Sequence, residues 1–141
     1  MNHSNKIDCN EYFITENLVD LEDSDYFKIE ISNLNENNFW ESIHFQIYNI
    51  LKIEFCIKDE NSFMTFCNLK DFKTKPILFI FKNLNFMIKK ENKNLKHSYL
   101  DVFRSMKLKP DIYFIQSVII CGNQELYNSF CDHFFIFINK K

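Results

Sequence analysis

The amino-acid sequence predicts a three-layer α/β domain with a mainly parallel sheet. The continuous apolar runs at residues 77–81 and 134–138, and the mainly apolar segment at residues 114–120, are typical of strands that a parallel sheet buries on both faces. The segments between them repeat apolar side chains every three or four residues, as amphipathic helices do. Strands that alternate with helices form parallel sheets covered by helices. With 141 residues, 46% hydrophobic and 26% charged, the chain is long enough for one such domain.

The first elements form a strand followed by a crossover of two helices. Residues 26–31 alternate partly between apolar and charged side chains, which predicts a strand with one exposed face or near a sheet edge. Residues 39–51 carry an apolar stripe that predicts a long amphipathic helix, with Trp40 anchoring it in the core. A second helical pattern begins after a polar cluster and covers residues 63–72.

The central strand of the expected sheet is the run at residues 77–81, which Pro76 introduces. A polar loop is expected at residues 89–96, followed by a helix over residues 99–106 that ends before Pro110. This helix carries the chain to the next apolar strand.

The last part of the chain predicts two strands joined by a short helix. The strand at residues 114–120 ends at Cys121 and Gly122, and Asn123 caps a helix that runs to Phe130. Residues 134–138 form the final buried strand.

The polar and acidic residues 1–25 are expected to be a lead-in to a single α/β domain over residues 26–141. Residues 10–17 are only weakly strand-like, and residues 20–25 form a local acidic cluster. No apolar run resembles a secretory signal or approaches the ~20 residues that cross a bilayer. We therefore expect an intracellular, cytoplasmic protein without membrane contact, and the nucleus stays open as a location.

Charge, glycine content and cysteine spacing exclude several classes of function. The formal charge of -2 and the pI near 6.1 argue against a nucleic-acid partner. Because Gly122 is the only glycine, the sequence cannot contain the glycine-rich loops that hold phosphates or dinucleotides. The five cysteines have neither zinc-site spacing nor an even number, so we expect reduced thiols and no metal.

Several segments resemble the AAA-like ATPase domains of the P-loop nucleoside triphosphatase superfamily. In that family a strand, a long helix and a short helix precede the strand that carries the Walker B acids, and a further helix precedes the sensor-type strand. The corresponding segments of this chain are residues 39–42, 61–66, 75–84, 102–107 and 115–122. The resemblance covers residues 26–130 and implies a P-loop-like fold.

The resemblance also implies that the phosphate machinery is missing. The sequence contains no G-x-x-x-x-G-K-[ST], and the positions that resemble the Walker B acids are Lys82 and Asn83. Asn123 is nearest to the sensor position, although a helix-capping role suits it better. We expect no cofactor and no nucleotide hydrolysis. The strand that carries the P-loop would lie before residue 26, so the sheet is expected to lack a central member and to expose an edge and an apolar groove.

Two histidines and one cysteine were weighed as catalytic or metal-binding groups. Cys131 and His133 share one face of a strand, which is the minimum that a Cys-His enzyme requires. A buried cysteine and a strand-edge histidine explain the same pattern. His44 lies on the long helix, where a structural histidine is expected rather than a metal ligand.

Two basic features have both a structural and a binding interpretation. Residues 89–96 concentrate lysines that would contact phosphates or an acidic partner, but we expect them to form a solvated loop instead. Arg104, the only arginine, is expected to pair with Asp101 or Glu125 rather than to recognise an anion.

Three functions follow from these observations. The first is a non-catalytic, P-loop-NTPase-like interaction module that binds a protein partner or itself, without nucleic acid, membrane or metal. The second is a small inhibitor or immunity-type protein that covers a basic enzyme with the acidic residues 18–25. The third is a cryptic enzyme that uses Cys131 and His133. We expect the first, and therefore no enzymatic activity.

Overall fold

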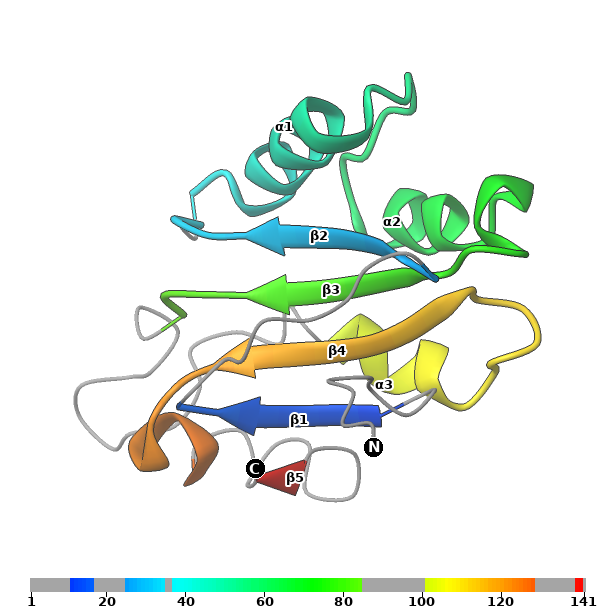
Figure 1. Ribbon diagram of the computed structural model, residues 1–141. Coiled ribbons are helices and arrows are strands. Elements are labelled where there is room, and N and C mark those ends of the chain that lie inside the picture. Colours follow the sequence, from blue (N-terminus) through cyan, green and yellow to red (C-terminus); the bar gives the residue numbers. More distant parts are fainter. Residues whose placement is uncertain (1–10, 17–24, 35–36, 85–100, 129–138, 141) are drawn as a thin grey trace.

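The computed structural model describes residues 11–16, 25–34, 37–84, 101–128 and 139–140. Its centre is a parallel five-stranded sheet with the order β2-β3-β4-β1-β5 (Figure 1). The strands are β1 (Glu11–Thr15), β2 (Phe27–Ile31), β3 (Ile77–Phe81), β4 (Ile115–Cys121) and β5 (Asn139–Lys140). The predicted α/β class with a parallel sheet is confirmed.

The helices lie where the apolar periodicity predicts them. They are α1 (Phe39–Leu51), α2 (Glu60–Cys67), the 3-10 helix η1 (Lys70–Phe72) and α3 (Val102–Lys107). Residues 124–128 are also helical, directly after the predicted cap. The expected strand at residues 134–138 and the expected loop at residues 89–96 lie outside the described residues.

Strand β1 corrects the expectation that the sheet lacks a central member. The sequence of residues 10–17 is only weakly strand-like, yet Glu11–Thr15 pairs along its whole length with β4 and also pairs with β5. Four of its five residues are buried. The apolar stretch is short and flanked by polar residues, so its local pattern is weak, and pairing with β4 supplies the stability that the pattern does not reveal.

The side chains of the strands alternate between two hydrophobic clusters, one on each face of the sheet. The larger cluster takes Ile14, Ile29 and Phe79 together with the buried residues of α1, α2 and α3. The smaller cluster contains Phe13, Tyr26, Leu78, Ile80 and Ile119. Adjacent residues of one strand point to opposite faces, so both sides of β3 are apolar. All five residues of β3 are buried, which confirms the predicted central strand.

Aromatic side chains connect the helices to the sheet in the larger cluster. The ring centroids of Phe63, Phe79 and Phe103 lie 5.4 Å from one another in each pair, and they join α2, β3 and α3. Phe103 also makes edge contacts with Tyr12 and Phe81. Such pairs contribute roughly 0.5–1.5 kcal/mol each beyond the area they bury.

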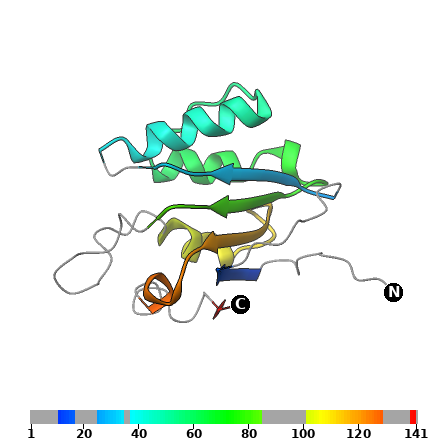
Figure 2. The same cartoon turned by 60° about the vertical axis from the view of Figure 1, so that its left-hand side comes forward.

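Helix α1 lies along β2, at the end of the sheet opposite β5 (Figures 1 and 2). Its buried residues are Phe39, Ile43 and Ile47, which follow the predicted stripe. Trp40, expected to anchor the helix, is only partly buried and packs on Phe39 and on Phe63 of α2. Phe39 lies four positions before Ile43 and eight before Ile47, so it shares their buried face of the helix and fills the core position.

Strand β2 occupies one end of the strand order, as its alternating sequence predicts.

Among the residues that the structure describes, no helix is both long and apolar enough to cross a membrane.

Candidate functional site

The carboxyl ends of the parallel strands form one edge of the sheet, which is where α/β proteins usually bind ligands. Lys82 and Asn83 follow β3, and Asn123 follows β4 after Gly122. Strands β3 and β4 are neighbours, with Phe81 opposite Ile120. The structure thus brings the three positions singled out in the sequence to the same edge of the sheet.

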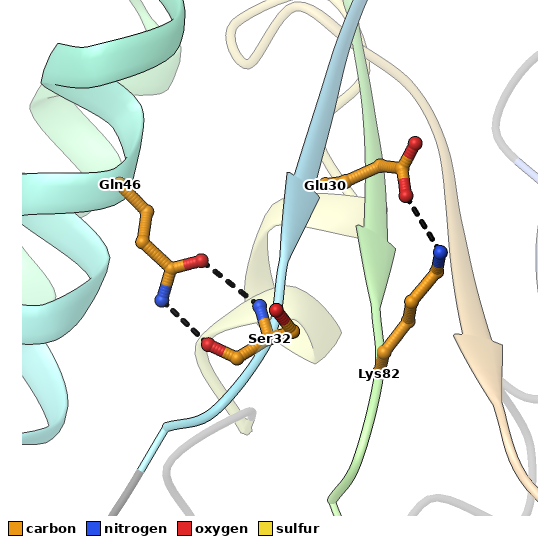
Figure 3. A network of polar contacts seen from close by, with 4 residues as sticks. All are labelled: Glu30, Ser32, Gln46 and Lys82. Carbon is orange, nitrogen blue, oxygen red and sulfur yellow. Dashed lines mark hydrogen bonds and ion pairs between the residues drawn. The ribbon is translucent and has the colours of Figure 1, made fainter.

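Lys82 is held in an ion pair with a carboxylate from the adjacent strand. Its Nζ lies 2.7 Å from Oε1 of Glu30, and the two side chains point toward each other (Figure 3). The hydrogen bond to Glu30 raises the pKa of Lys82, because the pairing favours the charged ammonium form. Both side chains are about 40% exposed, which limits the pair to about 1 kcal/mol of stability.

Cys121, at the end of β4, also belongs to this site, although the sequence did not predict it there. It packs against the smaller cluster and interacts electrostatically with Lys82 and Glu30. Partial burial raises the pKa of Cys121, and the Lys82 charge opposes this effect without cancelling it. The raised pKa disfavours the thiolate, which is the nucleophilic form of cysteine.

The alternation of strand residues contained the signal for this cluster. Ile29 and Ile31 enter the larger cluster, so Glu30 between them lies on the other face, which is also the face of Lys82 and Cys121. The sequence does not show that β2 and β4 flank β3, and this neighbourhood brings the three side chains together.

Asn83 adopts a left-handed backbone conformation at the turn after β3. Its φ of 61° is left-handed, a conformation that asparagine adopts more readily than most residues. Asn33 has a φ of 57° at the equivalent position after β2, because Ile31 pairs with Phe81. Each asparagine precedes a buried leucine, Leu34 or Leu84. The two left-handed residues therefore turn the chain so that a leucine enters the core.

Asn123 caps the helix that follows β4, as expected. Its Oδ1 accepts a hydrogen bond of 3.0 Å from the Leu126 backbone N–H. Gly122 beside it is required by packing, because a Cβ at this position would overlap the side chain of Leu126.

A second polar contact fixes α1 to the end of β2. The side-chain amide of Gln46 donates to the Ser32 carbonyl at 2.7 Å and accepts from the Ser32 N–H at 2.9 Å (Figure 3). The glutamine amide thus satisfies both backbone groups of Ser32, as a neighbouring strand would. This contact closes the outer edge of β2 at its carboxyl end.

Two further sequence expectations concern single side chains. Arg104 lies 3.9 Å from Asp101 in an (i, i+3) ion pair, which confirms one of its two expected partners. His44 accepts a hydrogen bond of 3.1 Å at Nδ1 from the Ile57 N–H, so it joins α1 to the segment before α2. The structural interpretation of His44 is confirmed.

The remaining candidates lie outside the described residues. These are the Cys131–His133 pair, the basic residues 89–96 and most of the acidic residues 18–25. Across the part of the chain that the structure describes, His, Cys, Asp and Glu form no group of three that could hold a metal ion.

Comparison of the chain with protein families, curated proteins and solved structures finds no match. The class of the protein therefore follows from its own geometry. It is an α/β domain with a parallel sheet, whose carboxyl edge carries a paired lysine, a half-buried cysteine and two turn-forming asparagines.

Proposed function

We propose that this chain is a non-catalytic interaction module built on a P-loop-NTPase-like scaffold. The observation that carries the proposal is the ion pair between Lys82 and Glu30 at the carboxyl end of β3. In the family that the sequence resembles, this end of the strand holds a Mg²⁺ ion through a carboxylate. Here an ammonium group lies at this end, and the carboxylate of Glu30 is bound to it.

The electrostatics of this edge disfavour a divalent cation. Lys82 repels a second cation, and the hydrogen bond from Lys82 uses an oxygen of Glu30 that a metal would need. Asn83 carries no charge, so it neither neutralises Mg²⁺ nor acts as a base for an attacking water.

The order of the elements supports a P-loop-like scaffold. A strand, a long helix, a short helix, a strand, a helix and a strand follow one another as β2, α1, α2, β3, α3 and β4. Strand β1 precedes them, where the family carries its phosphate loop. Neither the end of β1 nor any other part of the sequence contains the glycines and lysine of that loop.

Exposed apolar side chains support an interaction role. Phe45, Tyr48 and Ile50 of α1 are 40–63% exposed, and Leu108 and Ile112, between α3 and β4, are 68% and 44% exposed. Large apolar side chains that gather on a surface are typical of protein interfaces.

A single-turnover assay tests the absence of catalysis. Excess purified protein is mixed with radiolabelled ATP and Mg²⁺, and phosphate release is followed beside an active P-loop ATPase. We expect release at the rate of the buffer blank. The double variant Lys82→Asp, Asn83→Glu restores carboxylates, and we expect it to stay inactive because no phosphate loop is present. Turnover by the wild-type protein above the blank would overturn the proposal.

A further inference from the structure

A shallow surface depression of about 330 Å³ lies at the opposite, amino-terminal edge of the sheet. Helix α2 forms one wall, and the two residues just before Phe114 and β4 form the other. Its lining consists of Asn61, Met64, Thr65, Asn68, Ile112 and Tyr113. The first wall consists of three α2 residues, Asn61, Met64 and Thr65, and the helix C-cap, Asn68. They are spaced by one, three or four positions and therefore form one continuous stripe on the helix surface.

Hydrogen bonds between the two walls form the depression before any ligand arrives. The Asn68 Nδ2 donates to the Ile112 carbonyl at 2.6 Å. Beside it, the Phe114 N–H donates to the Cys67 carbonyl at 2.9 Å. A site whose walls are fixed in advance loses less conformational entropy on binding.

The lining combines an apolar floor with uncommitted polar groups. Met64 and Ile112 provide aliphatic surface, and the Tyr113 ring is partly buried between them and the core. Within the described structure, the Asn61 side-chain amide, the Asn68 Oδ1 and the Tyr113 hydroxyl make no hydrogen bond to protein. These groups are therefore free to pair with the N–H and C=O groups of a peptide backbone.

The charge and size of the depression restrict its occupant. Although 26% of the chain is charged, no charged residue lines the depression. An ionised ligand would gain no counter-charge from these residues. It would also lose more hydration free energy on burial than an uncharged ligand does. The volume is at the lower end of the roughly 300–1,000 Å³ range of ligand pockets, which suits one side chain with its adjoining peptide groups.

We infer that this depression binds an uncharged, extended peptide segment of a protein partner, with one apolar side chain on Met64 and Ile112. The inference rests on the proposed interaction function and specifies the surface and the chemistry of the partner. Asn61, Asn68 and Tyr113 hold the peptide groups beside the anchor side chain. This combination of tyrosine and asparagine with an aliphatic anchor is common in peptide-binding surfaces.

Nuclear magnetic resonance titration of the ¹⁵N-labelled full chain tests the inference. The probes are blocked amino acids, N-acetyl-leucine methylamide and N-acetyl-phenylalanine methylamide, and the matched charged probes are the aspartate and lysine equivalents. We expect saturable shifts of the Asn61 and Asn68 side-chain amides with the neutral probes only. Equal or stronger shifts with a charged probe, or no shift with any probe, would overturn the inference.

Variants locate the binding and separate it from the proposed function. Ile112→Ser removes the exposed anchor surface, and we expect neutral-probe affinity to fall at least about fivefold. Glu54→Ser, at an exposed position between α1 and α2 and outside the depression, is the control and should bind normally. Unchanged affinity in Ile112→Ser would contradict the assignment, and so would self-association of the wild type that this variant abolishes. Neither result affects the prediction of no ATP turnover, which the single-turnover assay tests separately.

Discussion

Asparagine takes the place of glycine at two of the three described positions where this chain has a left-handed backbone. Among the described residues, Asn33, Lys52 and Asn83 have positive φ values and are not glycine. The sequence has a single glycine, so the turns after β2 and β3 rely on the residue that tolerates this conformation next best. Turn geometry thus accounts for Asn83, which the sequence resemblance assigns to a degenerate Walker B-like position.

Substitutions at Asn83 distinguish turn geometry from a chemical role. Asn83→Val places a β-branched side chain in the left-handed region and should lower the free energy of unfolding by about 1–2 kcal/mol. Asn83→Gly should stay close to wild type, because glycine adopts this φ freely. Urea unfolding curves measure both. Equal losses in the two variants would show that the side-chain amide, rather than the backbone, stabilises the turn.

Asp59 caps the helix that forms one wall of the depression. Its side chain accepts from the Ser62 N–H at 2.8 Å, and Ser62 accepts in return from the Asp59 N–H at 3.0 Å. The hydrogen bond from the Ser62 backbone lowers the pKa of Asp59, so the charged form is favoured in the folded state. The cap therefore stabilises the fold above about pH 4 and is lost as the pH falls through the folded pKa.

This linkage predicts how an Asp59 variant responds to pH. Asp59→Ala should melt at a lower temperature than wild type at pH 7, and the gap should narrow when the pH drops below about 4. Asp59→Asn keeps a capping oxygen and serves as the control, with a smaller loss at pH 7. Thermal unfolding from pH 7 to 2.5 measures the difference. A gap that is constant over this range would refute the role of the charged cap.

At the scale of elements, β1 is the strand on which the account of the sheet depends most. Ile14 in β1 is buried in the larger cluster, and β1 pairs with both β4 and β5. Ile14→Ala should therefore destabilise the protein by about 2–5 kcal/mol, as truncation of a core side chain does. Phe45→Ala, at a position 63% exposed, should change stability by no more than about 0.5 kcal/mol. Denaturant unfolding measures both, and a loss below about 1 kcal/mol at Ile14 would contradict a core position for β1.

How well the sequence predicts an element depends on how far its signal is local. The five apolar residues of β3 and the helical stripe through Phe39, Ile43 and Ile47 carry their own patterns, so both elements were predicted with nearly correct bounds. Strand β1 has only three consecutive apolar residues, from Tyr12 to Ile14, and its partner lies about a hundred residues further along the chain. A pairing of this kind leaves no trace in a short window of sequence.

The candidate site shows the same division. The sequence places Lys82 and Asn83 after a buried strand and Asn123 before a helix, and the structure has them there. The ion pair from Lys82 to Glu30 depends on the strand order, which local patterns do not specify. The depression at the other edge forms where α2 packs against the residues just before β4, so no sequence motif predicts it.

At the scale of the whole molecule, the two edges of the sheet differ in chemistry. The carboxyl edge, where parallel α/β sheets usually bind their ligands, carries a lysine paired with a glutamate. The amino edge carries an uncharged depression with a preformed wall. We therefore propose that a partner binds at the amino edge, and we expect no nucleotide site at the carboxyl edge of the described sheet.

Thermal unfolding of the purified full chain with and without Mg·ATP tests this claim most directly. A ligand present at about 100 times its dissociation constant adds about 2.7 kcal/mol of stability. For a domain of this size, that increment raises the unfolding midpoint by roughly 4 °C or more. We predict superimposable melting curves at millimolar Mg·ATP. A midpoint that rises by several degrees, and rises further with nucleotide concentration, would reveal a nucleotide site and contradict the account.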